Sequence, residues 1–127
     1  MIPDQLKYEV DKLKIEGYRI EEEEREDGFI HICIKEYPLP EGYNKNFITL
    51  LIKVPLSFPN GKPDMFWADA DLTLSDGKGP KSTSKESIFG TEWLRFSWHP
   101  GKWNPGNDNL ETYLGFINSG LRGARNA

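Results

Sequence analysis

The chain has 127 residues, which is enough for one domain and excludes a second catalytic module. Its 37% hydrophobic residues provide a core, and no apolar run approaches the roughly 20 residues of a membrane span. The net charge is -4, and residues 42–127, with 10 basic and 8 acidic residues, are too weakly basic to indicate nucleic-acid binding. The N-terminal residues lack the basic and apolar regions of a signal peptide, so we expect a cytoplasmic protein.

The first predicted element is a surface helix at residues 4–16. Its apolar residues recur at helical spacing and are Leu6, Val10 and Leu13. Gly17 follows as the C-terminal stop of this helix. The next segment, residues 18–25, has four consecutive glutamates and only one aliphatic residue, which favours an exposed edge strand over a charged connection.

Two alternating segments then predict an antiparallel β-hairpin. Residues 29–37 place three isoleucines on one face of a strand. The other face of this strand carries Phe29, His31, Cys33 and Lys35. Residues 47–54 read as a second, strongly apolar strand, whose core residues are Ile48, Leu50, Ile52 and Val54.

The middle of the chain is predicted to be largely irregular. In residues 55–63 a proline stands at every fourth position and removes a backbone donor, which disfavours both a helix and a strand. Residues 65–67 form a short apolar run that fits a third core strand, and residues 75–87 are predicted to be a polar loop.

The second predicted helix, at residues 109–121, has the clearest pattern. Its apolar stripe consists of Leu110, Tyr113, Leu114, Ile117 and Leu121. We expect Asp108 to cap this helix, with Glu111 in the capping-box position. Residues 122–127 are predicted to be a frayed tail, so the single domain comprises residues 1–121. These elements predict an α+β domain with helices packed against an antiparallel sheet of about four strands.

No local motif predicts a catalytic or metal site. Ser97 and His99 have the types of a nucleophile and its base, but no strained turn supports them. Asp69 and Asp71 lack a third oxygen ligand at a calcium-loop spacing, and the glycines around Lys78 lack the Gly-Lys-Ser/Thr of a phosphate loop. One cysteine and two histidines exclude a structural zinc cluster, and we expect neither a metal nor a cofactor.

The thiol and the tryptophans are predicted to have structural roles. Cys33 lies inside a strand, with no helix N-terminus and no cationic sequence neighbour to lower its pKa, which favours a packed and inert thiol. Large aromatic residues are more often core anchors than a binding platform. This interpretation applies to Trp93, Trp98 and Trp103.

The order of the motifs is nevertheless informative. An apolar strand leads into Pro55-x-x-Phe58-Pro59-x-x-x-Pro63, and Trp103-x-Pro105 precedes the second helix. Between them lie Asp64-Met65-Phe66-Trp67 and Trp93-x-x-Phe96-Ser97-Trp98-His99. In this order, residues 38–121 resemble a ubiquitin-conjugating-enzyme (E2) domain, and specifically the prokaryotic E2-like family E. The resemblance covers nearly the whole chain with the first helix, and it implies a UBC-like fold with a C-terminal crossover helix.

The catalytic residues of E2 enzymes do not carry over to this chain. An E2 accepts the C-terminus of a ubiquitin-like protein on a cysteine, because a thiolate is both a good nucleophile and a good leaving group. That cysteine lies about eight residues before the Trp of Trp-x-Pro. Counting back from Trp103 reaches Arg95, next to Phe96, and neither residue forms a thioester. The histidine-proline-asparagine element is missing too, and the polar loop of residues 75–87 takes its place.

Three functions therefore stay open. The favoured hypothesis is a non-catalytic E2-like protein, a pseudoenzyme. The resemblance implies a bacterial ubiquitin-like modification system with an E1-like enzyme, a ubiquitin-like protein and a metal-dependent isopeptidase, in antiphage defence. The first alternative is an active conjugating enzyme with an unusual acceptor: Cys33, Ser97 or His99. The second is an unrelated α+β protein-interaction domain.

By analogy with the surfaces that E2 domains use, two regions are candidate partner contacts. In the first helix, the candidates to face the E1-like enzyme are Lys7, Lys12 and Lys14. The second region is the vestigial active site, which consists of Ser97, Trp98 and His99. No nucleic-acid or membrane partner is expected.

Overall fold

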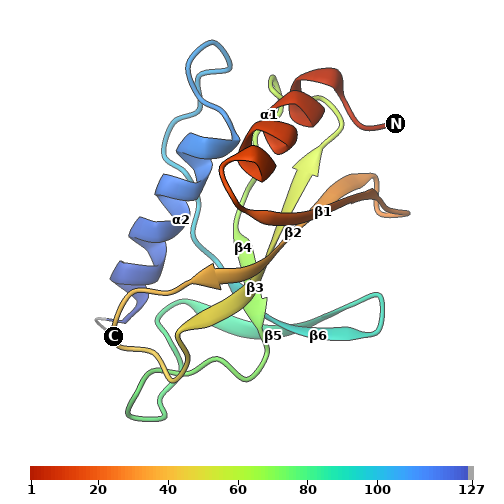
Figure 1. The fold of residues 1–127 in the computed structure, drawn as a ribbon. Coiled ribbons are helices and arrows are strands. Elements are labelled where there is room, and N and C mark those ends of the chain that lie inside the picture. The colour runs from red at the N-terminus through yellow and green to blue at the C-terminus, as the bar shows by residue number, and fades with distance from the viewer. Residues whose placement is uncertain (126–127) are drawn as a thin grey trace.

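The computed structural model describes residues 1–125 and contains two helices and one antiparallel sheet of six strands. In chain order the elements are α1 (Asp4–Ile15), β1 (Arg19–Glu24), β2 (Phe29–Pro38), β3 (Phe47–Pro55), β4 (Phe66–Asp69), β5 (Thr83–Ile88), β6 (Thr91–Phe96) and α2 (Leu110–Ala124). The strand order is β1-β2-β3-β4-β6-β5. In Figure 1, α2 runs along one side of the sheet, and α1 lies near the first turn of α2. The β5–β6 hairpin lies at the opposite end of the molecule from α1. The α+β class and both terminal helices are thereby confirmed.

The expectation of about four strands was wrong, because the last five residues of the predicted polar loop, 83–87, pair with the chain that follows them. β5 and β6 form a hairpin whose last pair joins Ile88 and Thr91. The two residues between them, Phe89 and Gly90, have positive φ values of 48° and 83°, as a tight type I′ turn requires. β5 is mostly exposed and polar, so the pairing with β6 rather than a hydrophobic pattern makes it a strand.

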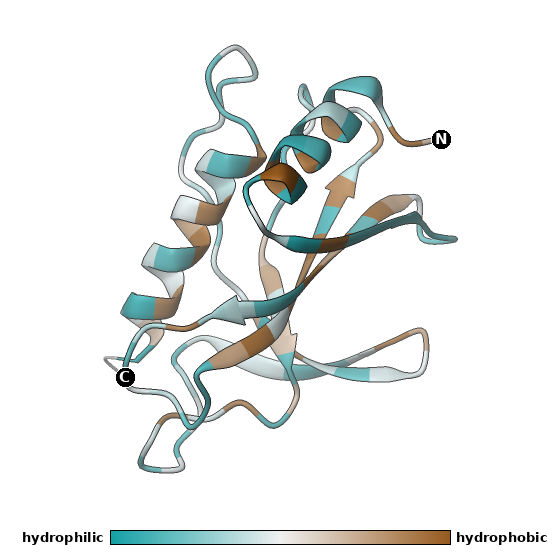
Figure 2. Ribbon diagram, in the orientation of Figure 1, coloured by the Kyte–Doolittle hydropathy of each residue, from teal (hydrophilic) through white to brown (hydrophobic). Residues whose placement is uncertain are grey.

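The core lies between one face of the sheet and the two helices. The predicted isoleucine face of β2 is confirmed, since Ile30, Ile32 and Ile34 are all 0% exposed. The core residues of β3 and of both helices are buried in the same cluster. Figure 2 shows hydrophobic residues on β2 and β3 and on the side of α2 nearest the sheet. Each such aliphatic side chain stabilises the fold by roughly 1.5–3 kcal/mol relative to its exposed state.

The opposite face of the sheet, which we call the open face, carries the alternate residues of each strand. One row crosses five strands: Glu21 lies opposite Cys33, Cys33 opposite Leu51, Leu51 opposite Trp67, and Trp67 opposite Arg95. Adjacent strands are about 4.8 Å apart, so three steps place the backbones of Cys33 and Arg95 about 14 Å apart. Cys33 and Arg95, the position expected for an E2 cysteine, therefore lie on the same face of the sheet but far apart on it.

The cap of α2 differs from the prediction by one residue. Asn109 is the N-cap: its side chain accepts a hydrogen bond from the Thr112 amide at 2.8 Å, and the Thr112 hydroxyl accepts one from the Asn109 amide at 2.9 Å. Asp108 instead serves the preceding turn, where its carboxylate accepts a hydrogen bond from the Asn104 amide at 2.7 Å. Glu111 consequently takes no part in the capping box.

The predicted tail begins later than expected, because α2 continues to Ala124. Ala124 is 0% exposed, and its carbonyl accepts a hydrogen bond from the Lys81 amide at 2.9 Å. Arg125 donates to the Glu41 carbonyl at 2.8 Å. The end of the helix is thus tied to two loops, and the remaining predicted tail, residues 126–127, lies outside the described residues.

Candidate functional site

The position expected for an E2 cysteine lies within strand β6. Arg95 is on the open face, and its Nη1 lies 3.6 Å from a carboxylate oxygen of Glu86 on β5. Phe96 is 0% exposed, and its ring stacks on Phe66 with the centroids 4.7 Å apart. β6 pairs on both sides, with β4 and β5, which holds both residues in place. A cation and a core aromatic residue thus stand where a nucleophile would be needed.

Beyond β6, the structure brings His99 to Asp64, the first residue of the Asp64-Met65-Phe66-Trp67 motif. Nδ1 of His99 lies 2.7 Å from Oδ1 of Asp64, and the two side chains are 59% and 44% exposed. A carboxylate in this position orients the imidazole and leaves Nε2 for another partner. Asp64 precedes His99 by 35 residues, and no spacing in the sequence connects the two.

Ser97 and His99 do not form a nucleophile–base pair. Within residues 1–125 no hydrogen bond joins the Ser97 hydroxyl to the His99 imidazole, and the Ser97 amide donates to the Ser82 carbonyl at 2.9 Å. A nucleophile–base mechanism needs these two groups within hydrogen-bond reach. The Ser-x-His spacing therefore does not create the contact that this chemistry requires.

Trp98 lies half-buried against α2. Its Nε1 donates to the Lys81 carbonyl at 3.3 Å. A Cβ atom added at Gly123 would lie 2.8 Å from the Trp98 ring, and one added at Gly120 would lie 3.7 Å from it. Two glycines of α2 thus give this indole the space to pack closely, while its role in binding a partner stays a prediction.

The two motifs that carry the E2 resemblance pack against each other. The Trp103 indole lies 6.0 Å from the Phe58 ring and 6.4 Å from the Tyr113 ring, centroid to centroid. Its Nε1 donates to the Pro59 carbonyl at 2.7 Å. Trp103 therefore connects the proline-rich segment to α2. Pro59 precedes Asp64 in the chain and Trp103 follows His99, so their hydrogen bond joins the two segments that carry the His99–Asp64 pair.

Cys33 lies in the middle of β2, partly buried on the open face. Burial raises the pKa of its thiol above the ordinary value, and Glu21 and Glu23 on the neighbouring strand raise it further. Lys35 and Arg25 lower it, but desolvation is the largest of these effects. A thiol in this environment is a weak nucleophile at neutral pH.

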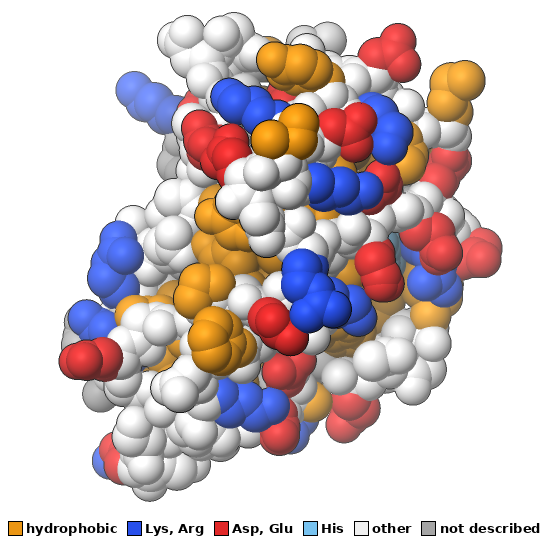
Figure 3. All heavy atoms as spheres, in the orientation of Figure 1, with side chains coloured by type: hydrophobic (Ala, Val, Ile, Leu, Met, Phe, Trp, Pro, Cys, Tyr) orange, Lys and Arg blue, Asp and Glu red, His pale blue; other side chains and the backbone are white. Residues whose placement is uncertain are grey.

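The three candidate lysines of α1 differ in their surroundings. Lys7 and Lys14 both bind Glu22 of β1, at 3.3 and 3.1 Å, and Lys7 also binds Asp11. Lys12 is exposed and makes no ion pair within the described part of the chain. Figure 3 shows basic and acidic side chains interspersed on the face that carries α1. α1 therefore presents a mixed surface on which Lys12 is the most available cation.

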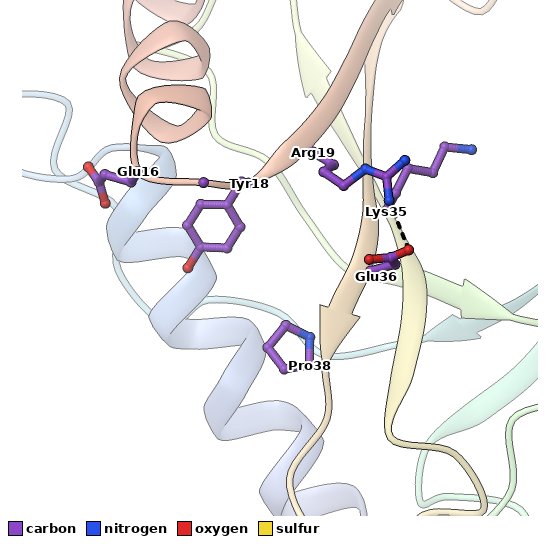
Figure 4. A pocket seen from close by; sticks show the side chains of 7 residues that line it. Glu16, Tyr18, Arg19, Lys35, Glu36 and Pro38 are labelled. Atoms are coloured by element: carbon purple, nitrogen blue, oxygen red, sulfur yellow. Dashed lines mark hydrogen bonds and ion pairs between the residues drawn. The ribbon is translucent and has the colours of Figure 1, made fainter.

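A surface depression of about 360 Å³ lies where α1 passes into β1 (Figure 4). Its walls include the Tyr18 ring and an ion pair of 2.8 Å between Arg19 and Glu36. Lys35 and Pro38 complete the wall formed by β2. The depression includes neither Cys33 nor the vestigial-site residues Ser97, Trp98 and His99, so it is a separate feature of the surface.

Acidic residues in the structure are engaged mainly in ion pairs. Asp69 and Asp71, the pair considered for calcium, both bind the Lys45 ammonium.

Over residues 1–125, no cluster of three or more His, Cys, Asp or Glu side chains has a geometry that could hold a metal ion. In the same part of the chain, neither helix combines the length and the apolar character needed to cross a membrane.

Comparison with known proteins gives one match. The model of prokaryotic E2 family E matches residues 6–124, which include all six strands, α2, most of α1 and the vestigial site. Searches of curated proteins and of solved structures find no significant match. Because the matched region covers nearly the whole chain, the resemblance is confirmed. The chain belongs to prokaryotic E2 family E.

Proposed function

We propose that this chain is a non-catalytic E2-like protein that binds or positions a ubiquitin-like protein, its E1-like enzyme, or both. The observation that carries the proposal is the pair of side chains at the expected cysteine position. Arg95 is bound to Glu86, and Phe96 is buried in the core. Membership of the family implies interaction with ubiquitin-like proteins or E1-like enzymes in general. The chain thus combines an E2-like framework with a position that cannot form a thioester.

The environment of the only thiol supports the same proposal. Transfer of an acyl group through an E2 needs a thiolate near neutral pH. The pKa of Cys33 is raised by burial, which keeps the thiol protonated at that pH. Its backbone is also about 14 Å from that of Arg95, by three strand spacings of about 4.8 Å.

Two surfaces are proposed to contact partners. The first is α1, where Lys7, Lys12 and Lys14 are proposed to face the E1-like enzyme. The second is the vestigial site, where His99 is proposed to offer its Nε2 while Asp64 holds Nδ1. A bacterial modification system, with a role in antiphage defence, is the proposed setting of these contacts.

A charging assay tests the proposal directly. The wild-type protein and a Cys33→Ser variant are incubated with ATP, the E1-like enzyme and the ubiquitin-like protein encoded in the same genome. The products are resolved on non-reducing gels. We expect a charged E1-like enzyme, no adduct on either form of this chain, and co-purification of at least one partner with both forms.

Each other outcome contradicts the proposal in a different way. An adduct that is lost on reduction and absent from Cys33→Ser would make Cys33 an acceptor and the chain an active conjugating enzyme. An adduct on both forms that resists reduction would indicate an oxyester or isopeptide, with Ser97 and His99 the first residues to test. No adduct and no co-purification would leave an interaction domain outside ubiquitin-like modification.

A further inference from the structure

The open face contains a cavity of about 280 Å³ in which cationic, acidic and apolar side chains meet. Its cations are Lys53, Lys62 and Arg95. Its carboxylates are Asp64 and Glu86. Met65 and Trp67 form part of its apolar wall. The cavity therefore has one net positive charge at neutral pH, next to aromatic surface, and it adjoins the vestigial site through Asp64.

Arg95 is the cation of this cavity with an unfilled hydrogen-bonding capacity. A guanidinium has five N–H donors. Among residues 1–125 its ion-pair partner is Glu86, at 3.6 Å from Nη1, and Glu86 also accepts a hydrogen bond from the Trp67 indole at 2.9 Å. Nε of Arg95 is buried and has no hydrogen-bond partner within residues 1–125. Because Nε has almost no accessible surface, a ligand reaches Arg95 through its terminal nitrogens, of which Nη1 has only the 3.6 Å contact with Glu86.

The two lysines are also only weakly neutralised. The Lys53 ammonium lies 4.9 Å from the centre of the Trp67 ring and 3.6 Å from a carboxylate oxygen of Asp27. The Lys62 ammonium lies 3.5 Å from the Pro100 carbonyl, and no carboxylate pairs with it within the described residues. Asp64 is meanwhile bound to His99 at 2.7 Å. Lys53 and Arg95 each have a carboxylate at 3.6 Å, so the Lys62 ammonium is the cation of the cavity that has no carboxylate partner within residues 1–125.

We propose that this cavity binds the C-terminal carboxylate of a partner polypeptide. A planar guanidinium matches a carboxylate through paired N–H···O hydrogen bonds, which we assign to the two terminal nitrogens of Arg95. A carboxylate carries the single negative charge that the unpaired Lys62 ammonium balances, whereas a phosphate dianion would exceed it. The apolar side of the cavity, which includes Met65 and the 38% exposed Phe29, receives the residue that carries the carboxylate, and the two acids of the lining disfavour more strongly anionic ligands.

The inference deepens the proposed function, and it rests on that function only for the identity of the partner. The reactive end of a ubiquitin-like protein is its C-terminus. A cavity for a free carboxylate would hold this end without forming a covalent bond. Arg95 would then bind the terminal carboxylate, the group with which the cysteine of an active E2 forms a thioester.

The test uses the isotopically labelled full chain and three small probes. N-acetyl-Leu-Gly with a free carboxylate, its C-terminal amide and inorganic phosphate are titrated separately at pH 7 and equal ionic strength. The readout is the NMR resonance of the Trp67 indole N–H, which a Trp67→Phe variant identifies among the four tryptophans. We expect a saturable shift with the free carboxylate, and at least tenfold weaker binding of the amide and of phosphate.

Matched variants separate the cavity from general charge effects. We expect Arg95→Gln to weaken binding of the carboxylate at least tenfold. Lys62→Gln, which changes an exposed cation and leaves the Arg95–Glu86 pair in place, should weaken it at least threefold. Lys35→Gln removes a cation of the open face outside the cavity and should have no effect. Lys62→Gln keeps the test valid if Arg95→Gln does not fold.

Three results would overturn the inference: no saturable shift with the carboxylate, equal binding of the amide, or phosphate binding as tightly as the peptide. The proposed function is judged separately, by co-purification of the ubiquitin-like protein with wild type and with Arg95→Gln. If that partner binds both forms equally, the inference fails and the proposed function stands. If the peptide binds as expected but neither partner co-purifies, the proposed function fails and the cavity remains a carboxylate site.

Discussion

The side-chain carboxylate of Glu9 on α1 accepts a hydrogen bond at 2.7 Å from the backbone amide of Leu110, the first residue of α2. The other carboxylate oxygen of Glu9 accepts one from Gln5 at 2.6 Å. A negative charge at a helix N-terminus also interacts favourably with the helix dipole. One buried acid thus joins the two helices, although Glu9 and Leu110 are 101 residues apart in the chain.

Loss of this acid is expected to destabilise the fold. In Glu9→Ala the buried Leu110 amide loses its acceptor, and we expect the free energy of unfolding to fall by about 1–3 kcal/mol. Glu9→Gln keeps an acceptor and should lose less. Glu16→Ala, at an exposed position after α1, is the control and should change stability by less than about 0.5 kcal/mol. Urea denaturation measures all three, and equal stability of Glu9→Ala and wild type would contradict the assignment.

The contact between Trp98 and α2 makes a second prediction. A Cβ atom at Gly123 would be only 2.8 Å from the Trp98 ring, so Gly123→Ala should displace the indole and destabilise the protein by about 1–3 kcal/mol. Gly115→Ala is the matched control on the same helix, because nothing lies within 4 Å of its added Cβ. Alanine is the better helix former, so this control should stabilise α2 by up to about 1 kcal/mol. Denaturation curves and tryptophan fluorescence check both changes.

The buried tyrosines predict a loss of stability in alkali. Burial raises the pKa of Tyr37 and Tyr43 to about 12. An unfolded chain ionises its tyrosines near pH 10, so between pH 10 and 12 the unfolded state releases protons that the folded state retains. The free energy of unfolding is therefore unaffected by these groups below pH 10 and falls as the pH rises toward 12.

Tyr37→Phe isolates one of these groups. The wild type should lose roughly 2–3 kcal/mol more stability than Tyr37→Phe across this pH range. Below pH 9 the difference between the two proteins should be constant and should reflect the lost hydrogen bond of 2.6 Å to Asn118. Denaturation at several pH values measures the two slopes, and parallel slopes above pH 10 would refute the explanation.

The lysines of α1 are expected to affect binding rather than folding. The Lys7 and Lys14 ammonium groups are exposed and share Glu22, so each single variant, Lys7→Ala or Lys14→Ala, leaves Glu22 one cation and should cost only about 0–1 kcal/mol of stability. Together with Lys12→Ala they should weaken binding of the E1-like enzyme at least tenfold. Lys78→Ala, an exposed lysine in the loop before β5, is the control. Unchanged affinity of the triple variant in a calorimetric titration would exclude α1 as the contact.

His99 provides a test of the vestigial site. Its pair with Asp64 is exposed, so His99→Ala and Asp64→Asn should each change stability by less than about 1 kcal/mol. Both should weaken binding of the ubiquitin-like protein, because Asp64 orients the imidazole that is proposed to contact it. Lys102→Ala, at a neighbouring exposed position, should bind as wild type does. Normal binding by His99→Ala would leave this residue with a structural role only.

The elements that sequence predicted well are those with a strong local pattern. The apolar stripe of α2 and the isoleucines of β2 identify their elements because one face of each must be buried. β5 was missed because its polar residues form a strand only by pairing with β6. The cap of α2 was misplaced from Asn109 to Asp108 because both residues have suitable side chains, and the preceding turn uses Asp108.

The candidate site divides in the same way. The order of the motifs, the family, and the absence of a cysteine at position 95 follow from the amino-acid sequence, because these depend only on residue type and spacing. The folded chain was needed to show that Asp64 holds His99 and that Cys33 lies three strands away from Arg95. It was also needed to show that Lys53, Lys62 and Arg95 line one cavity. These relationships join residues far apart in the chain, and the register of the antiparallel strands and the packing of loops against them bring such residues together.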